Sequence, residues 1–368
     1  NDFVKENPTS KKAKSIKAVA HCVEKASIKK GLHHCQEILK QVTMLIDDED
    51  MYGLLAYSNQ DEIFSWQSPI VWSVRPDEKN VKKYISHLSP PELGLYDYFI
   101  YIDDPKDDKK TKEFKSKFRK KYFEFIEQTF KTVLPNDYKD FKAQDVWDVE
   151  LQLLDAMGCS KIKKEDPDYY NVVTKDELEK EYGFNWTKFT EKIGKRTPFP
   201  GEYWVSASGY KTPPKKVIVS SLNALKCTTE LLKKNWSSKK WKTYWLFMFY
   251  KQMLRFDWDW TIYSIFPLSF CYNTFLTEQY VAHNNDPLKE AYVKNMVDDL
   301  KYIFIKRIEK NTWLSPSTKK AALAKLHKLE VVIGTPKNLR QDPILEYVAD
   351  DPWYNMALLS GWKRSEFI

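Results

Sequence analysis

The sequence predicts a mostly α-helical protein, and three observations support this fold class. Only 10 of its 368 residues are glycine, which is fewer than a turn-rich β protein needs. The chain contains 20 Phe, 22 Tyr and 13 Trp, enough aromatic surface for a large core and more than disordered chains carry. Apolar residues also recur at helical spacing, most clearly in the row Phe114, Phe118, Tyr122, Phe125, Ile126 and Phe130.

The N-terminal part is expected to hold two helices followed by a β-hairpin. Apolar positions between residues 10 and 30 fall on one helical stripe, and a second helix is expected after Gly31, ending near Ile46. Residues 52–57 form a short apolar run, and residues 64–74 alternate between apolar and polar side chains. With a turn-like segment between them, these runs predict a small antiparallel β-hairpin near residues 52–75, with Pro69 at an edge or bulge.

Helices are expected to dominate the rest of the chain. The row that begins at Phe114 should end at Pro135, and the next helix should stop near Gly158. Short helices are expected at 175–182 and 186–193, then a Pro- and Gly-punctuated segment at 197–214, a strand at 217–219 and a helix at 222–234. The aromatic run 244–250 should be buried, residues 288–308 give the cleanest late helix, and Ser315 with Pro316 opens another. With no internal repeat, we expect one large helical lobe over residues 1–368.

The charge pattern disfavours nucleic acid as a partner. The net charge of +8 comes from 59 Lys and Arg against 51 Asp and Glu, with both signs interspersed. The densest basic run, residues 109–121, is interrupted by Glu113 and by two phenylalanines at helical spacing, which favours a solvent-exposed helix face. No membrane segment is expected, because the most hydrophobic stretch, residues 241–267, contains five charged residues. Residues 1–17 lack the apolar segment of a secretory signal.

The histidines do not form a zinc peptidase motif. In His-Glu-x-x-His, two imidazoles four residues apart meet at the metal and the glutamate activates water. None of the six histidines has a histidine four positions away or a following glutamate at the required place; they are His21, His33, His34, His87, His283 and His327. The nearest metal-like group combines His21, His33 and His34 with Cys22 and Cys35, and adjacent ligands on a helix point in different directions. We therefore expect no catalytic and no metal-binding residue in this chain.

Residues 311–336 follow an ordered pattern of a known family. The segment reads Asn-Thr-Trp-Leu-Ser-Pro-Ser-Thr-Lys-Lys-Ala from Asn311 and ends in Val-Ile-Gly-Thr-Pro at Pro336. It resembles the Thr-Trp, Thr-Lys-x-x-Ala and Ile-Gly-Tyr-Pro elements of the neprilysin-type zinc metallopeptidases, with Thr335 at the family's Tyr. Residues 91–99 are similar to the family's Leu-Gly-Leu-Pro-x-x-Asp-Tyr-Tyr segment, although they lack its Pro and one neighbouring position. Residues 217–250 are also similar, so the resemblance covers most of residues 10–360.

The resemblance implies a division of labour between two lobes. In this family a C-terminal lobe carries His-Glu-x-x-His and binds zinc, and a mostly helical lobe caps it and admits only small peptides. This chain resembles the capping lobe and is expected to end near the start of the catalytic one. The resemblance therefore implies zinc only in that missing lobe, the catalytic lobe of the same parent protein as partner, and small peptides as substrates. Family members are typically extracellular or membrane-anchored, and nothing in this chain determines its own compartment.

Two modifications are also expected. The family joins an early cysteine to one before its long helix, and Cys22 and Cys271 occupy the matching positions, so the resemblance implies a disulfide between them; two buried thiols are the alternative. Asn185 and Asn235 lie in Asn-Trp-Thr and Asn-Trp-Ser sequons, which would carry glycans only after secretion.

Two functions are consistent with these features. The first is the non-catalytic lobe of a neprilysin-like zinc metalloendopeptidase, forming the chamber wall and a size filter for peptide hydrolysis. The second is a structural or protein-interaction module derived from such a peptidase, with its activity lost. The shortened loop at Tyr96 and the high Lys and Asn content favour this function, and such a composition is typical of an AT-rich genome, such as that of a virus or protist. A free-standing enzyme of another type has no catalytic motif to support it.

Overall fold

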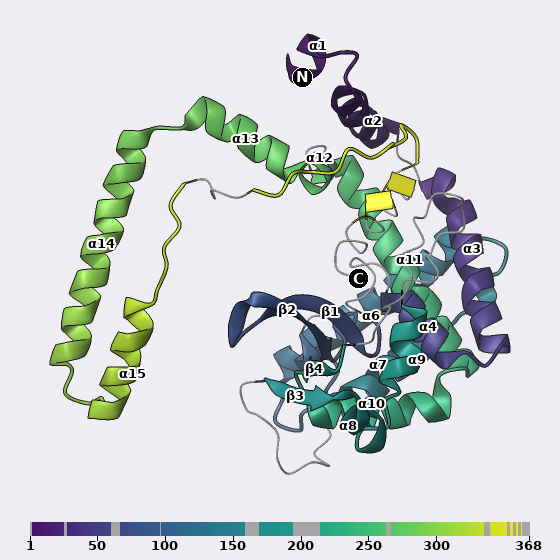
Figure 1. The fold of residues 1–368 in the computed structure, drawn as a ribbon. Coiled ribbons are helices and arrows are strands. Elements are labelled where there is room, and N and C mark those ends of the chain that lie inside the picture. Colours follow the sequence, from purple (N-terminus) through teal and green to yellow (C-terminus); the bar gives the residue numbers. More distant parts are fainter. Residues whose placement is uncertain are drawn as a thin grey trace. The chain divides into compact units, whose positions relative to one another are not determined.

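The computed structural model confirms a mostly α-helical chain with one small sheet (Figure 1). It describes residues 2–25, 28–59, 67–95, 97–158, 169–193, 214–262, 266–334 and 339–351, together with residues 354, 355, 358, 359 and 362. The chain divides into two compact units, and each is described by itself. Unit 1 comprises Asn1–Pro267 and Leu345–Ile368, and unit 2 comprises Leu268–Ile344.

Unit 1 begins with four helices, α1 (Asp2–Glu6), α2 (Lys11–Lys25), α3 (Ile28–Asp47) and α4 (Met51–Asn59). Helix α3 buries one stripe whose members recur every three or four residues and are at most 4% exposed: Cys35, Ile38, Val42 and Leu45. The two predicted N-terminal helices are thus present, and the second already begins at Ile28, so Gly31 lies within it rather than before it.

The structure contains a β-hairpin, but not the predicted one: residues 71–74 of the expected second strand begin its first strand, and its second strand, residues 80–89, was not predicted. Residues 52–57 lie in α4, and the two antiparallel strands are β1 (Val71–Asp77) and β2 (Asn80–Ser89). Helix α4 buries residues 54–59 without an exposed side, so it lacks the polar face that distinguishes a surface helix from a buried strand. Pro69 lies in the turn before β1, and residues 60–66 of the expected hairpin lie outside the described residues.

The sheet has four strands in the order β1-β2-β4-β3. Strand β4 (Lys216–Val219) was predicted, whereas β3 (Asn171–Thr174) was not. The β2 and β4 strands run parallel through the pairs His87–Ile218 and Leu88–Val219, and β3 is antiparallel to β4. The side chain of Asn171 reinforces the last pair by donating from Nδ2 to the Val219 carbonyl at 3.0 Å.

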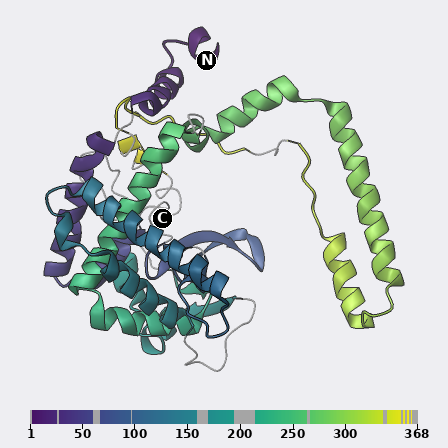
Figure 2. The same ribbon diagram turned by 180° about the vertical axis from the view of Figure 1, so that it is seen from behind.

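Six further helices of unit 1 agree closely with the sequence predictions: α6 (Lys109–Val133), α7 (Ala143–Met157), α8 (Lys175–Lys180), α9 (Trp186–Lys192), α10 (Leu222–Asn235) and α11 (Lys239–Ile262). Short 3-10 turns η1 (Tyr98–Ile100) and η2 (Tyr138–Asp140) flank α6, which lies on the face of unit 1 turned toward the viewer in Figure 2. Part of the expected segment at 197–214 lies outside the described residues.

The aromatic core of unit 1 is centred on α11. Every residue from Tyr244 to Tyr250 is at most 3% exposed, which confirms the prediction that this run is buried. The Tyr250 hydroxyl donates to the Cys35 carbonyl at 2.9 Å, and the Phe247 ring lies 6.2 Å from that of Phe130. Helix α11 therefore fastens α3 and α6 to one core.

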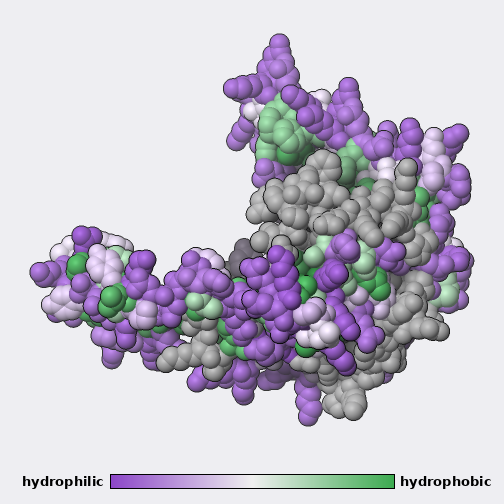
Figure 3. Space-filling model, turned by 90° about the horizontal axis from the view of Figure 1, so that it is seen from above, coloured by the Kyte–Doolittle hydropathy of each residue, from purple (hydrophilic) through white to green (hydrophobic). Residues whose placement is uncertain are grey.

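Unit 2 contains three helices after the short α12 (Phe266–Cys271): α13 (Asn273–Asn284), α14 (Pro287–Lys310) and α15 (Pro316–His327). Asp286 caps α14, whose first residue is Pro287, and the Ser315 hydroxyl caps α15 by accepting from the Thr318 N–H at 3.2 Å. Both helix starts agree with the sequence prediction. Green apolar surface lies among purple polar surface on this unit in Figure 3. Among the described residues, no helix is both long and apolar enough to cross a membrane.

Candidate functional site

The metal-like residues of the N-terminal part that the structure describes are not grouped as metal ligands. Across the described residues, no group of three or more His, Cys, Asp or Glu side chains is arranged to hold a metal ion. His34 instead pairs with Asp351, with 2.9 Å between Nε2 and Oδ2, whereas His21 is exposed. The side chain of His33 lies outside the described residues. These side chains therefore do not fit a catalytic zinc site, and the sequence resemblance places that site in another lobe.

A buried carboxylate, Glu150, connects four separate segments of unit 1. Its Oε1 accepts from the Tyr122 hydroxyl at 2.8 Å and from the Gly94 N–H at 2.9 Å. Its Oε2 accepts from the Tyr101 hydroxyl at 2.8 Å, and that hydroxyl in turn accepts from the Leu95 N–H at 2.9 Å. Because Glu150 is only 2% exposed, these bonds replace the water that the carboxylate gave up on folding.

Burial decides the electrostatics of this Glu150 cluster. Loss of solvent raises the pKa of Glu150, against the opposing effects of the Lys251 charge and of the donated hydrogen bonds. Burial also raises the pKa of Tyr101 and of Tyr122, and the adjacent carboxylate raises both further. Lys251 donates from Nζ to the Gly94 carbonyl at 3.2 Å. The Glu150 carboxylate is buried and accepts three hydrogen bonds, so we assign the cluster a structural role.

Gly94 has no room for a side chain at this cluster. A Cβ there would lie 1.6 Å from the Tyr122 hydroxyl oxygen and 2.6 Å from Glu150 Oε1. Gly94 belongs to residues 91–99, one of the segments that resembles the neprilysin family. Sequence comparison thus marked this part of the cluster, but no spacing pattern indicated Glu150 or Tyr122 as its partners.

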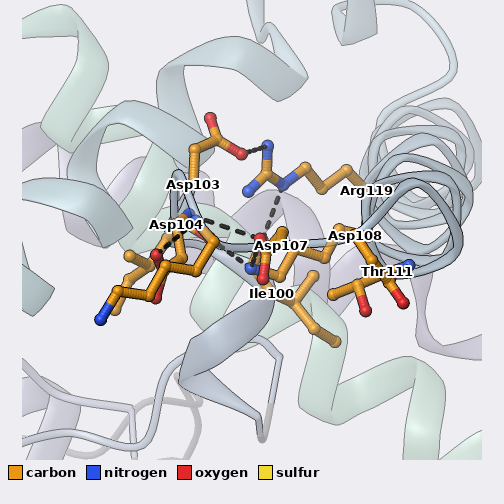
Figure 4. Close-up of polar contacts among 10 residues, drawn as sticks. Ile100, Asp103, Asp104, Asp107, Asp108, Thr111 and Arg119 are labelled. Carbon is orange, nitrogen blue, oxygen red and sulfur yellow. Dashed lines mark hydrogen bonds and ion pairs between the residues drawn. The ribbon is translucent and has the colours of Figure 1, made fainter.

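A second polar cluster binds the loop after η1 to α6 (Figure 4). Arg119 donates from Nε to the Ile100 carbonyl at 2.6 Å, and its Nη1 lies 2.9 Å from Oδ1 of Asp103. Lys115, which is only 4% exposed, donates to the Ile102 carbonyl at 2.7 Å and forms an ion pair with Asp107. The hydrogen bond from Lys115 lowers the pKa of Asp107.

The N-terminus of α6 completes this second cluster. Asp108 accepts from the Thr111 N–H at 2.7 Å, and this backbone bond lowers the pKa of Asp108. The cations of the cluster therefore bind carbonyls and carboxylates of the chain itself, and the loop 100–108 is fixed on α6.

Unit 2 presents a long apolar stripe on α14. No residue of α14 is buried, although its apolar residues recur at helical spacing. The exposed fractions of the side chains are 83% for Leu288, 72% for Tyr292, 59% for Leu300 and 56% for Phe304. An exposed apolar stripe of this length is typical of an interaction surface.

The comparison with protein families agrees with the fold. The family model described as Peptidase family M13 matches residues 2–260 and 271–336. The chain belongs to peptidase family M13. The neprilysin-type resemblance of the sequence is thereby confirmed, and the M13 match includes α14, α15 and the Glu150 cluster.

Solved structures of M13 peptidases have the same fold. The zinc metalloprotease Zmp1 of Mycobacterium tuberculosis, solved with an inhibitor, has a TM-score of 0.66 at 19% identity, over 95% of this chain and 53% of that one. PepO of Lactobacillus rhamnosis HN001 has a TM-score of 0.68 at 16% identity, over 100% of this chain and 58% of that one. The M13 chain described here thus spans little more than half the length of these structures. No curated protein sequence matches it.

The remaining predicted residues stay predictions in this M13 chain. Cys22 and Cys271 are both buried, and the structure does not support the bridge that the resemblance implies, which stays a prediction. Cys227, on α10, is disulfide-bonded. Asn185 caps α9 by accepting from the Lys188 N–H at 2.8 Å, and Asn235 ends α10. Both sequons therefore lie at helix ends, a feature that the sequons alone did not reveal.

Proposed function

We propose that this chain is the non-catalytic helical lobe of an M13 zinc metalloendopeptidase. In this role unit 1 forms part of the wall of a chamber and limits the size of the peptides that enter it. Another part of the same parent protein would bind zinc and hydrolyse the peptides. The observation that carries the proposal is the family match over residues 2–260 and 271–336 in a chain whose sequence lacks His-Glu-x-x-His.

The size of the chain relative to its structural neighbours supports this division. Zmp1 is described as a zinc metalloprotease, and this chain aligns with 53% of its length. The donor groups of a zinc site are lacking among the described residues. We therefore place the hydrolytic chemistry in the part of an M13 peptidase that lies beyond this alignment.

The α14 stripe supports a role in assembly with that part. Four large side chains at Leu288, Tyr292, Leu300 and Phe304 remain more than half exposed. Covering such a stripe removes apolar surface from water and favours association by roughly 25 cal/mol per Å² buried. We propose that the catalytic lobe of the parent protein covers it.

Hydrolysis of a peptide series tests the proposed function. The parent reading frame is sequenced past codon 368, and its catalytic segment is produced with and without this chain. Fluorogenic peptides of increasing length are then supplied, with and without a zinc chelator. We expect no hydrolysis by this chain alone, and preference for short peptides only when both parts are present. Hydrolysis by the chain alone, or a length preference that does not depend on it, would contradict the proposal.

Association of the two parts is measured separately. Leu300→Gln with Phe304→Gln should weaken it, whereas Lys294→Gln on the same helix should not. A reading frame that ends without a zinc motif would favour the interaction module instead, and the α14 stripe would then have a different partner.

A further inference from the structure

A buried histidine, His87, lies where the two halves of the sheet meet. The β1–β2 hairpin joins the β3–β4 pair through two residue pairs of parallel strands, His87–Ile218 and Leu88–Val219. One further backbone bond runs from the Ser220 N–H to the Leu88 carbonyl at 3.0 Å. Figure 1 shows β4 beside β2, with β3 beyond it. We call the residues His87, Leu88, Ile218, Val219 and Ser220 the seam of the sheet.

The imidazole of His87 is neutral in this position. Its Nδ1 lies 3.3 Å from a terminal nitrogen of the Arg75 guanidinium. Because a guanidinium can only donate, Nδ1 accepts and the single ring proton is on Nε2. The side chain is 1% exposed, and Nε2 has no hydrogen-bond partner in the part of the chain that the structure describes. Even the neutral ring therefore leaves one buried N–H unsatisfied, which costs free energy.

A proton on Nδ1 would turn the contact with Arg75 into a repulsion. The new N–H would face the guanidinium at hydrogen-bond distance, and both ring nitrogens would then need an acceptor. Burial lowers the pKa of His87, and the Arg75 charge lowers it further, against the opposing charges of Glu78 and Asp77. The closed seam therefore accommodates a neutral His87 and excludes a charged one.

The other charged groups around His87 do not compensate for a proton on its ring. Asp77 already accepts from the Tyr170 hydroxyl and from the Lys79 N–H, both at 2.8 Å. Glu78 is exposed in the turn between β1 and β2. Strand β3 has no titratable residue. On the side of the sheet that carries His87, the remaining titratable residues of β2 and β4 are exposed cations, Lys83 and Lys216.

A second attachment holds the tip of the hairpin and does not share this sensitivity. The Tyr170 hydroxyl donates to Asp77, and the Lys79 ammonium lies 4.2 Å from the centroid of the Tyr170 ring. The hydrogen bond from Tyr170 lowers the pKa of Asp77, so this carboxylate stays ionised at the pH at which a histidine gains a proton. Mild acid therefore acts on the seam and leaves the tip attached.

We propose that His87 is a pH-sensitive switch that opens the seam when the surroundings become acidic. While the imidazole is neutral, β2 and β4 stay paired. Once it gains a proton, the charged ring needs water and must move away from Arg75, which separates β2 from β4. This inference concerns the sheet of unit 1 alone and does not depend on the proposed function.

Hydrogen–deuterium exchange of the full chain tests this proposal. Exchange is measured between about pH 7.5 and pH 5 and corrected for the intrinsic effect of pH on the exchange rate. Because the open seam binds a proton that the closed seam excludes, the equilibrium constant for opening should rise by up to about tenfold per pH unit below roughly pH 6.5. Peptides from the seam should show this rise, whereas peptides from α7 should not.

Three variants identify the group that is responsible. His87→Gln can still accept from Arg75 but does not titrate, so the opening of the seam should no longer depend on pH. Arg75→Gln removes the cation beside Nδ1 and should reduce the pH dependence without abolishing it, because His87 stays buried. The control His21→Gln removes an exposed histidine from α2 and should leave the dependence of the wild type unchanged. Equal pH dependence in the wild type and in His87→Gln would overturn the proposal.

Nuclear magnetic resonance of chain labelled with ¹⁵N-histidine follows the ring directly, which keeps the proposal testable if His87→Gln does not fold. At neutral pH the nitrogen shifts of His87 should report a proton on Nε2. Its titration should lie below about pH 6.5, the value of an unperturbed histidine, and should move upward in Arg75→Gln. Titration at or above that value, or no change in Arg75→Gln, would also overturn the proposal.

Discussion

The Gly94 N–H donates to Oε1 of Glu150 across 2.9 Å, although 56 residues separate the two in sequence. This hydrogen bond brings the 93–95 loop against α7, beside the Tyr101 and Tyr122 hydroxyls that donate to the same carboxylate. The loop and the buried carboxylate therefore depend on each other.

Substitution of Gly94 should be strongly destabilising. A Cβ at 1.6 Å from the Tyr122 hydroxyl oxygen forces the loop or α6 to move, and we expect Gly94→Ala to cost about 2–3 kcal/mol in the free energy of unfolding. Urea denaturation measures this. Gly158→Ala is the control, because its Cβ would meet no atom closer than 3.7 Å, and it should be neutral or slightly stabilising. Equal effects of the two substitutions would show that the Gly94 contact is not tight.

The Glu150 carboxylate should impose a pH dependence on stability. Because burial raises its pKa in the folded protein, the folded state binds more protons than the unfolded state between the two pKa values. The contribution of Glu150 is thus greatest below its unfolded pKa and is lost as the pH rises toward the folded value. As the pH rises through this range, the free energy of unfolding of the wild type should fall relative to that of Glu150→Gln. The fall should be about 1.4 kcal/mol for each unit by which burial raises the pKa of Glu150.

Denaturation of both proteins between about pH 4 and pH 7 measures this difference. A difference that stays constant, or that grows in favour of the wild type with pH, would contradict a raised pKa for Glu150. The variant Tyr101→Phe removes one hydrogen-bond donor from the same carboxylate, so the pKa of Glu150 should rise further. The loss of stability with increasing pH should then be larger than in the wild type.

In oxidised material we expect a disulfide between Cys22 and Cys271. A bridge that closes so long a loop would add about 4 kcal/mol or more if it acts mainly on the unfolded chain. Peptide mapping by mass spectrometry without reduction identifies it, and the disulfide of Cys227 provides an internal sign that the sample is oxidised. Mapping that finds the Cys227 bridge but leaves Cys22 and Cys271 as thiols would exclude the pairing.

The two sequons should differ in occupancy when the chain is secreted from a eukaryotic host. Asn185 is held by two side-chain hydrogen bonds, one from the Lys188 N–H and one to Glu179 at 3.0 Å, and the next residue is the buried Trp186. Asn235 makes one helical bond to the Leu231 carbonyl. We therefore expect fuller glycosylation at Asn235. Intact mass before and after glycosidase treatment measures occupancy, with Asn185→Gln and Asn235→Gln as the single-site controls.

The long helices could be predicted from the sequence because each has one buried side. In α6 the apolar row is clear and Pro135 marks the end, so the prediction and the structure differ by only a few residues. Helix α4 was predicted as a strand because residues 54–59 are all buried, which removes the period of 3.6 residues. Strand β3 was missed because its four residues are too few to show an alternation.

The functional surfaces were predictable to different degrees. The stripe on α14 is visible in the sequence as a helix, but only the structure shows that unit 2 leaves it exposed. The Glu150 cluster joins residues 94, 101, 122 and 150, whose spacing follows no helical or strand period. Such tertiary contacts depend on the packing of α6 against α7, and no local pattern encodes that packing.

The parallel pairing of β2 with β4 also has a consequence for synthesis of the chain on the ribosome. The Leu88 carbonyl accepts from Ser220, and the two residues are 132 positions apart. The edge of β2 that pairs with β4 therefore stays unpaired until residues 216–219 have been translated, which takes roughly ten seconds at typical elongation rates. During that interval the β1–β2 hairpin carries an open edge of the kind that pairs with other chains. Helices α6 and α7 are translated meanwhile, but the aromatic core that they join is centred on α11, which is translated only after β4, so the sheet edge and the core are completed by the same late part of the chain.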